Sequence, residues 1–181
     1  MRLVLDACVL YPTVLRELLA GVAAAGLYEP LWSERILEEW ARAAVKLGPG
    51  AQGIARGEIA VITAAFPRAM VRTLPDIEAR LLLPDPNDRH VLATAIAGHA
   101  DAILTFNAVD FPRHVLAAEG LQRRDPDGFL WELWSHHPVA VSTVIARVHA
   151  RAEQISGRAL PLRALLKRAQ LPRLGRALQP S

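Results

Sequence analysis

The sequence predicts an α/β protein in which helices cover both faces of a central parallel sheet. Short apolar runs at 3–5 and 102–104 have the length and composition of buried strands. Segments with apolar residues at helical spacing separate these runs, and turn-forming residues such as Gly48-Pro49-Gly50 mark where the segments end. Alternation of this kind is typical of parallel sheets, whose crossover connections are right-handed. One main domain is expected, because 181 residues suffice for one α/β domain with a full core.

The first half of the chain contains three predicted helices. They share apolar residues at helical spacing and cover 13–25, 33–47 and 54–66. Ser33 stands at an N-cap position, with Glu34 in the first turn. We predict a short strand at 70–72, whereas the apolar run at 81–83 fits either a helix or a strand.

The second half continues the alternation of helix and strand. Turn residues at 84–88 precede a helix over 89–97, which Gly98 ends before the strand at 102–104. A further strand is expected near Leu121. The remaining predicted helices are 115–118, 128–134, 141–152 and 162–169.

Composition indicates an ordinary globular protein of the cytoplasm. Hydrophobic residues make up 52% of the chain and charged residues 22%, which argues against disorder or a fibrous structure. The longest uncharged apolar stretch, 18–28, is shorter than the roughly 20 residues of a membrane-spanning helix. Asp6 interrupts the segment in which a secretory signal would build its apolar region. Cys8 is the only cysteine, which excludes an internal disulfide and a zinc site made of several thiolates.

Charge is distributed unevenly along the chain. From Pro138 onward there are eight Lys and Arg residues and one Glu, so this segment carries +7, whereas residues 1–137 carry −4. A basic segment of this kind suits contact with an anionic partner. A solvated helix face explains the same pattern equally well.

Strand polarity selects polar residues at one edge of the predicted sheet. In open parallel sheets, ligands bind beyond the carboxyl ends of the strands. Asp6 closes the first strand, and Thr105, Asn107 and Asp110 follow a later one. Asp101 precedes that later strand, at its opposite end, and is expected in a surface turn.

Helical phase adds two more acids. At about 100° per residue, Glu39 lies at the edge of the apolar stripe of its helix, whereas Glu38 falls opposite the stripe and should face water. Asp88 projects from near the middle of the stripe of the following helix at 89–97. Burying an unpaired carboxylate is costly, so each buried acid needs a partner. Taken singly, a helix N-cap explains Asp88, a turn explains Asp6 and a solvated position explains Glu39.

Acids directed toward one end of a sheet repel one another, and a cation relieves the repulsion. Carboxylate oxygens without paired His or Cys ligands favour Mg²⁺ or Mn²⁺ over zinc. The six histidines do not pair with acids or with Cys8 at zinc spacing, and most of them are expected on the surface. One or two hard ions of this kind suit phosphodiester hydrolysis. The chain has no G-x-S-x-G nucleophile motif and no glycine-rich phosphate loop.

Four segments resemble the PIN-domain nucleases in order and spacing. They are Leu3-Val4-Leu5-Asp6-Ala7-Cys8-Val9-Leu10, Ile36-Leu37-Glu38-Glu39-Trp40, Asp85-Pro86-Asn87-Asp88-Arg89-His90-Val91-Leu92-Ala93 and Leu104-Thr105-Phe106-Asn107-Ala108-Val109-Asp110-Phe111. Four such motifs in sequence, with helices and strands between them, are fairly specific. The likeness covers about residues 1–135, so we expect a PIN-like nuclease domain there and a basic helical C-terminal extension over 136–181.

The resemblance implies a three-layer α/β/α fold, an Mg²⁺ or Mn²⁺ site and ribonuclease activity on RNA. It most often implies a VapC-like toxin with a small antitoxin protein as partner, and commonly a homodimer. Where many members carry an acid two residues after the threonine, this chain has Asn107, which leaves open whether one or two metals bind. The expected catalytic residues are Asp6, Glu39, Asp88 and Asp110, and the expected metal ligands are Asp6, Asp88, Asn107 and Asp110.

Other residues have secondary predicted roles. Thr105 is expected to orient a carboxylate or water, and Asp85 to cap its loop or support the site from outside. Five basic residues of the extension are predicted to contact RNA phosphates: Arg147, Arg151, Arg163, Lys167 and Arg168. Two alternatives stay open. One is a non-catalytic RNA-binding or protein-interaction module on a PIN scaffold, and the other is an RNA-processing nuclease of PIN type with no antitoxin.

Overall fold

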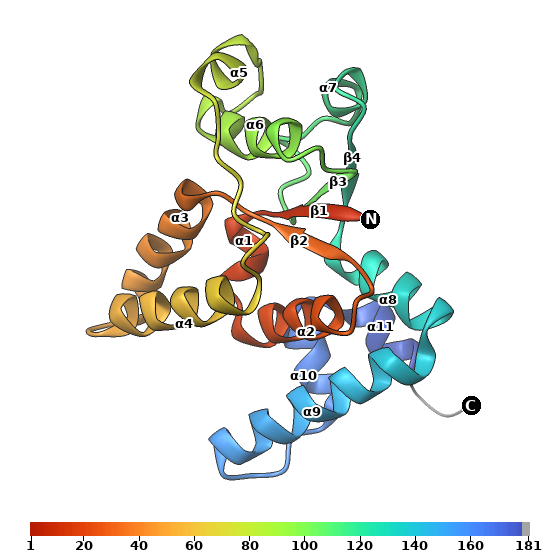
Figure 1. The fold of residues 1–181 in the computed structure, drawn as a ribbon. Helices are drawn as coiled ribbons and strands as arrows, with labels where there is room; N and C mark the ends of the chain where they lie inside the picture. The colour runs from red at the N-terminus through yellow and green to blue at the C-terminus, as the bar shows by residue number, and fades with distance from the viewer. Residues whose placement is uncertain (179–181) are drawn as a thin grey trace. The chain divides into compact units, whose positions relative to one another are not determined.

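Four parallel strands form a single sheet within residues 1–178, the part of the chain that the computed structural model describes. The strands lie in the order β2-β1-β3-β4 (Figure 1). Their bounds are Arg2–Leu5 for β1, Glu29–Leu31 for β2, Ala102–Leu104 for β3 and Gln122–Arg124 for β4. Because all neighbouring strands are parallel, their carboxyl ends meet at one edge of the sheet.

Strand β1 lies at the centre of this sheet because it is apolar on both faces. Leu3, Val4 and Leu5 are almost fully buried, as expected for a strand covered on both sides by helices. Strand β2 was not predicted. Its Pro30 lacks a backbone N–H, which a central strand would need, but the structure places β2 at the edge of the sheet, where a proline is tolerated.

Helices cover both faces of the sheet and confirm the predicted α/β/α arrangement. Helix α6 packs against β1 and β3 on one side, and α1 and α3 lie on the other (Figure 1). The helices that accompany the sheet are α1 (Ala7–Leu10), α3 (Glu34–Ala44), α4 (Ala51–Ala65), α5 (Pro75–Arg80), α6 (Arg89–Ala97) and α7 (Arg113–Ala118). Short 3₁₀ turns, η1 (Val45–Leu47) and η2 (Pro86–Asp88), complete the unit.

Local signals explain where several of these helices begin and end. The Oγ atom of Ser33 accepts a hydrogen bond from the backbone N–H of Ile36 at 3.4 Å, so the predicted N-cap is confirmed. Gly48 and Gly50 have positive φ angles of 115° and 80°, which separate α3 and η1 from α4. The prediction of a strand at 70–72 was wrong. Only an isolated bridge between Met70 and Trp32 forms there, because the chain does not stay beside the sheet for a second pair.

A second compact unit, helical in its regular structure, combines residues 12–27 with residues 125–178 of the described chain, whereas the first unit holds residues 1–11 and 28–124. Its helices are α2 (Thr13–Ala24), α8 (Pro126–His136), α9 (Pro138–Ser156), α10 (Leu162–Arg168) and α11 (Pro172–Ala177). Helix α2 packs against α9. Gly21 permits this close approach, since a Cβ atom there would lie 2.4 Å from Cγ1 of Val144.

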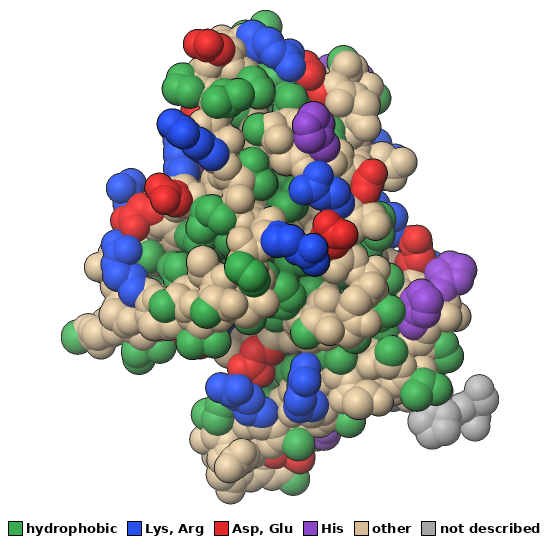
Figure 2. All heavy atoms as spheres, in the orientation of Figure 1, with side chains coloured by type: hydrophobic (Ala, Val, Ile, Leu, Met, Phe, Trp, Pro, Cys, Tyr) green, Lys and Arg blue, Asp and Glu red, His purple; other side chains and the backbone are tan. Residues whose placement is uncertain are grey.

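The surface carries charges of both signs. On the face shown in Figure 2, Lys and Arg side chains lie beside Asp and Glu side chains. Among the described residues, every helix is too short or too polar to cross a lipid bilayer.

Candidate functional site

Asp6 is fixed at the carboxyl edge of the sheet, between the ends of β1 and β3. Its backbone N–H donates to the carbonyl of Leu104 at 3.2 Å, and its own carbonyl accepts from Val9 N at the start of α1. The side chain is 8% exposed. Its Oδ2 atom accepts hydrogen bonds from Thr105 Oγ1 at 2.5 Å and from Cys8 Sγ at 3.2 Å. These donors hold the carboxylate in one orientation.

A continuous chain of hydrogen bonds links Asp6 to four other predicted site residues. Thr105 Oγ1, which donates to Asp6, accepts from the backbone N–H of Asn107 at 2.9 Å. Asn107 Nδ2 donates to Asp88 Oδ2 at 2.9 Å, and Asn107 Oδ1 accepts from the backbone N–H of Asp110 at 3.2 Å. The structure therefore brings together residues from three distant segments of the sequence.

The side chain of Asp88 does not act as a helix cap, although a cap would explain the residue taken alone. Asp88 precedes α6 but makes no side-chain cap hydrogen bond. Its φ and ψ of −85° and −4° are already helical, whereas a capping residue needs an extended backbone. Asp85 has that extended backbone, and its Oδ1 accepts from Asn87 N at 2.8 Å. The capping role thus belongs to Asp85, and the carboxylate of Asp88 is left to Asn107 and the site.

Crowding of negative charge raises the pKa of Asp88. Burial is the largest cause, and the carboxylates of Asp6, Asp85, Asp110 and Glu39 add to it, so the pKa rises from 3.8 to about 6. Asp6, Asp88 and Asp110 are thus close enough to repel one another through their charges. A cation placed among them would remove this repulsion.

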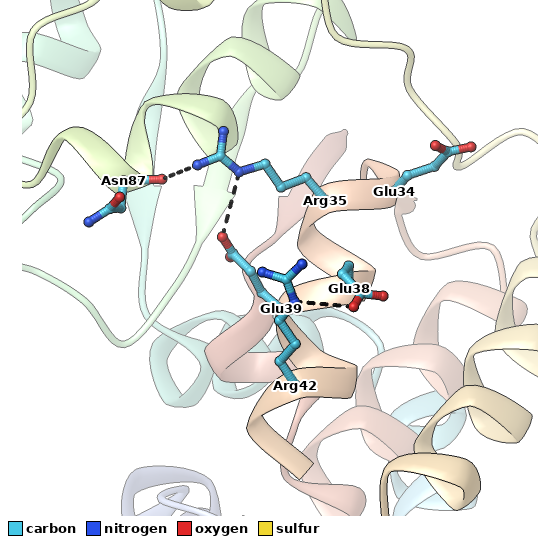
Figure 3. A pocket seen from close by; sticks show the side chains of 6 residues that line it. All are labelled: Glu34, Arg35, Glu38, Glu39, Arg42 and Asn87. Atoms are coloured by element: carbon cyan, nitrogen blue, oxygen red, sulfur yellow. Dashed lines mark hydrogen bonds and ion pairs between the residues drawn. The ribbon is translucent and has the colours of Figure 1, made fainter. Parts of the chain in front are cut away.

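Glu39 faces a different set of partners from those of the other acids. Its Oε1 lies 2.7 Å from Nε2 of His90 and 3.9 Å from Nε of Arg35. Arg35 extends between Glu39 and the backbone carbonyl of Asn87 (Figure 3). Glu38 is not simply solvated, as the helical phase had suggested. It pairs with Arg42 and with Arg56, and hydrogen bonds from both guanidinium groups lower its pKa.

His90 is a site residue that sequence reasoning missed. It was expected on the surface with most other histidines, but it is 1% exposed, because α6 is buried on all sides from His90 to Ala95. Its Nε2 approaches Glu39 closely without hydrogen-bond alignment, and neither ring nitrogen has a hydrogen-bond partner among residues 1–178. The only sequence signal was its place in the same motif as Asp88, two residues later.

Arg123 on β4 forms hydrogen bonds with the backbone of the loop that carries Asn107 and Asp110. Its Nη1 donates to the carbonyl of Ala108 at 2.5 Å and to that of Phe111 at 2.9 Å. No periodicity or motif marks this residue in the sequence, because its contacts depend on β3 and β4 lying side by side.

Glu39 is one of the residues that line an open cavity of about 630 Å³. Figure 3 shows the six side chains that line it: Glu34, Arg35, Glu38, Glu39, Arg42 and Asn87. Arg35 is held there by Glu78 at 2.9 Å. The cavity therefore combines acids with two guanidinium groups, which are suited to hydrogen-bond phosphate oxygens.

The oxygen donors fit a hard divalent cation better than a soft one. Within the described residues, no three His, Cys, Asp or Glu side chains converge tightly enough to form a closed cage for a metal. Mg²⁺ does not need such a cage, since it is usually bound by one or two carboxylates together with waters and substrate phosphates. Cys8 does not compete as a ligand, because burial and the Asp6 carboxylate raise its pKa to about 12 and keep the thiol protonated.

The site geometry coincides with the region that matches a known family. The sequence family described as PIN domain matches residues 2–108. The chain belongs to the PIN-domain family. The match spans β1 to β3 and includes Asp6, Glu39, Asp88 and Asn107, and Asp110 follows just beyond its end. PIN domains are generally nucleases and typically use divalent metals, so membership indicates a nuclease. No curated protein and no solved structure matches this chain.

The basic residues predicted to bind RNA lie in the helical unit. Arg147 and Arg151 are on α9, and Arg163, Lys167 and Arg168 are on α10. All five are exposed. Arg151 already pairs with Glu17 at 3.3 Å. Their contact with RNA stays a prediction, as does the role of Asn107 as a metal ligand.

Proposed function

We propose that this PIN-domain protein is an endoribonuclease that depends on Mg²⁺ or Mn²⁺. The observation that carries the proposal is the chain of hydrogen bonds from Asp6 through Thr105 and Asn107 to Asp88, where burial and then the neighbouring acids raise the pKa of Asp88 to about 6. An arrangement that keeps like charges together at a cost to stability is typical of sites that bind a cation or perform catalysis.

In this proposal Asp6, Asp88 and Asp110 supply the carboxylates that hold the cation, one or two of them directly and the rest through bound water, because no three of the described acids converge tightly on one point. When bound, such a cation neutralises charge on the scissile phosphate and activates water for in-line attack. Thr105 and Asn107 fix the orientation of Asp6 and Asp88 through the hydrogen bonds described above. Preorganised donors and acceptors of this kind lower the barrier because they need no rearrangement during the reaction.

Glu39 and the adjacent cavity supply a place for the RNA strand. Arg35 and Arg42 line this cavity together with Glu39, and guanidinium groups bind phosphates through two parallel hydrogen bonds. Glu39 Oε1 lies 2.7 Å from His90 Nε2 and 3.9 Å from Arg35 Nε, in contact with both side chains. This contact keeps the Glu39 carboxylate near the site without placing it among the ligands of the cation.

The direct test is cleavage of a pool of random-sequence RNA oligonucleotides and of the matching DNA pool. With Mn²⁺ or Mg²⁺ the RNA pool should be cleaved, and with EDTA it should stay intact, because the acids alone cannot neutralise the phosphate. Cleavage of RNA in EDTA would contradict metal dependence, and equal cleavage of DNA would contradict specificity for RNA. Binding of RNA without cleavage under any metal would favour the non-catalytic alternative.

We further propose that the protein is a VapC-like toxin that acts in the cytoplasm, as a homodimer neutralised by a small antitoxin protein. The support is the resemblance of the four sequence motifs in order and spacing. Controlled expression in a bacterial host should arrest growth for the wild type and not for Asp6→Asn at equal protein levels. Normal growth with active wild-type enzyme would favour an RNA-processing nuclease instead. Light scattering of the purified protein tests the dimer.

A further inference from the structure

The helical unit contains a second cavity with a different character, between α10 and α11. Its volume is about 550 Å³, which lies within the range of roughly 300–1,000 Å³ typical of small-molecule pockets. Three cationic side chains line it, namely Arg163 and Lys167 from α10 and Arg176 from α11. No acidic residue is among the lining residues.

The three cations have no acidic partner in the part of the chain that the structure describes. Other arginines of the same unit are occupied, since Arg151 pairs with Glu17 at 3.3 Å and Arg173 stacks over the ring of Trp131 at 3.6 Å. Arg163 and Lys167 are four residues apart on one helix face, where like charges destabilise the helix. An anion in the cavity would relieve this repulsion.

The rest of the cavity wall is apolar and rigid. Pro161, Ala164 and Pro172 line it. Gly175 of α11 lies beside Leu166 of α10, since a Cβ atom at Gly175 would be in ordinary van der Waals contact with Cβ of Leu166 at 3.5 Å. A nucleotide matches this combination, because its phosphate pairs with cations while its sugar and base cover apolar surface. An acidic side chain of a peptide pairs with cations as well, but it has no sugar or base to cover the apolar surface.

We propose that this cavity is a nucleotide pocket, in which Arg163, Lys167 and Arg176 bind the phosphate of one unstacked nucleotide of single-stranded RNA. The nucleotide must be unstacked because only a base outside a duplex can enter a cavity of this size. The pocket rests on the proposed ribonuclease function, for which it supplies an RNA contact within the helical unit.

The test compares two triple variants that lose the same net charge. The pocket variant is Arg163→Gln/Lys167→Gln/Arg176→Gln, and the control is Arg68→Gln/Arg72→Gln/Arg158→Gln, whose residues are also exposed but neither line the cavity nor belong to the predicted RNA contacts. Binding of a fluorescent single-stranded RNA pool is measured by anisotropy in EDTA at several salt concentrations. The full-length chain is used throughout, and thermal melting confirms that both variants fold.

The pocket variant should bind RNA at least about 10-fold more weakly at low salt, and the slope of log affinity against log salt should become shallower by about 0.7, the contribution of one phosphate contact to a single strand. The control should change affinity by less than about threefold, because its side chains are dispersed and do not together bind one phosphate. Equal weakening of RNA binding in both variants, or unchanged RNA binding by the pocket variant, would overturn the proposed nucleotide pocket.

Two competitors identify the occupant. Adenosine monophosphate should displace the RNA from the wild type, and inorganic phosphate should do so less well because it lacks the apolar part. If the monophosphate binds but RNA does not, the RNA assignment is overturned in favour of a free nucleotide. A polyglutamate peptide that binds more tightly than RNA overturns it in favour of an acidic protein partner.

Failure of this inference is distinguishable from failure of the proposed function, because the binding assay needs no cleavage. If the protein cleaves RNA with metal but both variants bind RNA equally well, only the proposed nucleotide pocket is contradicted. If RNA binding depends on the pocket residues but the protein never cleaves RNA, the nucleotide pocket is supported and the proposed ribonuclease function is contradicted.

Discussion

Replacing Asp6 by Asn should lower the rate of metal-dependent RNA cleavage by about 10²–10³-fold, since a lost metal carboxylate removes several kcal/mol of charge stabilisation and each 1.4 kcal/mol or so is tenfold in rate. The fold should survive. Asn has the same shape, and its side-chain oxygen can still accept from Thr105 and Cys8, which donate to Asp6 Oδ2 in the wild type.

Asp101→Asn provides the matched control for this variant. Asp101 precedes β3 at the opposite edge of the sheet, is exposed, and accepts from the backbone N–H of Arg2 at 2.6 Å. The same chemical change there should leave the cleavage rate within about twofold, as is usual for surface substitutions. Half of the wild-type rate in Asp6→Asn, or a comparable loss in Asp101→Asn, would contradict the assignment of Asp6 to the site.

Replacing Asp88 by Asn should stabilise the metal-free protein while abolishing its response to metal. Burial and the neighbouring carboxylates raise the pKa of Asp88 from 3.8 to about 6, so between these values the folded state binds more protons than the unfolded state. The free energy of unfolding therefore falls as pH rises through this window, and the full cost is present above about pH 6. Asn carries no charge and avoids this cost at neutral pH.

The expected size of this effect is small in EDTA and larger with metal. Because Asp88 is only partly buried, solvent screening reduces the cost to about 1 kcal/mol, which raises the melting temperature of Asp88→Asn by about 2–4 °C. Mn²⁺ at about 100 times its dissociation constant should raise the melting temperature of the wild type by about 5–10 °C. The same Mn²⁺ should leave that of Asp88→Asn almost unchanged.

Thermal melts between pH 4 and pH 8 check both parts. In EDTA the difference between Asp88→Asn and wild type should vanish near pH 4, where both side chains are neutral in the folded state. A variant that melts below the wild type at neutral pH would contradict the charge crowding. An undiminished shift with Mn²⁺ would show that Asp88 does not contribute to metal binding.

Strand polarity predicted one half of the site because it depends on little beyond the strand order. Asp6 follows β1, and Thr105 and Asn107 follow β3. These strands are adjacent and parallel, with Leu5 opposite Leu104, so residues directly after them must lie close together. Any sheet that places β1 and β3 side by side and parallel would have given the same result.

The rest of the site depends on details that residue patterns do not contain. Whether Asp88 caps α6 was decided by its backbone angles, which a sequence pattern cannot distinguish from those of a capping residue. The contact between His90 and Glu39 joins two helices whose relative placement is tertiary. Arg123 acts through carbonyl groups, which every residue possesses. Because α6 is buried on all sides from His90 to Ala95, the spacing of its apolar residues did not indicate that His90 lies in the interior.

The same limit applies to the fold. Helix α2 was predicted correctly as a helix, but its packing against α9 joins segments from opposite ends of the chain. Pro30 concealed β2, since a proline argues against a strand unless the strand lies at an edge. Local patterns therefore predicted most elements, and packing between distant elements decided their neighbours.

The rate of RNA cleavage as a function of free Mn²⁺ concentration shows whether the acids around Asp6 cleave RNA through a bound cation. We expect no cleavage in EDTA, and a rate that rises with the same midpoint as calorimetric binding of Mn²⁺ to the protein, with both signals lost in Asp6→Asn. Cleavage that is undiminished in EDTA, or saturated Mn²⁺ binding without cleavage of any RNA in the pool, would contradict this expectation.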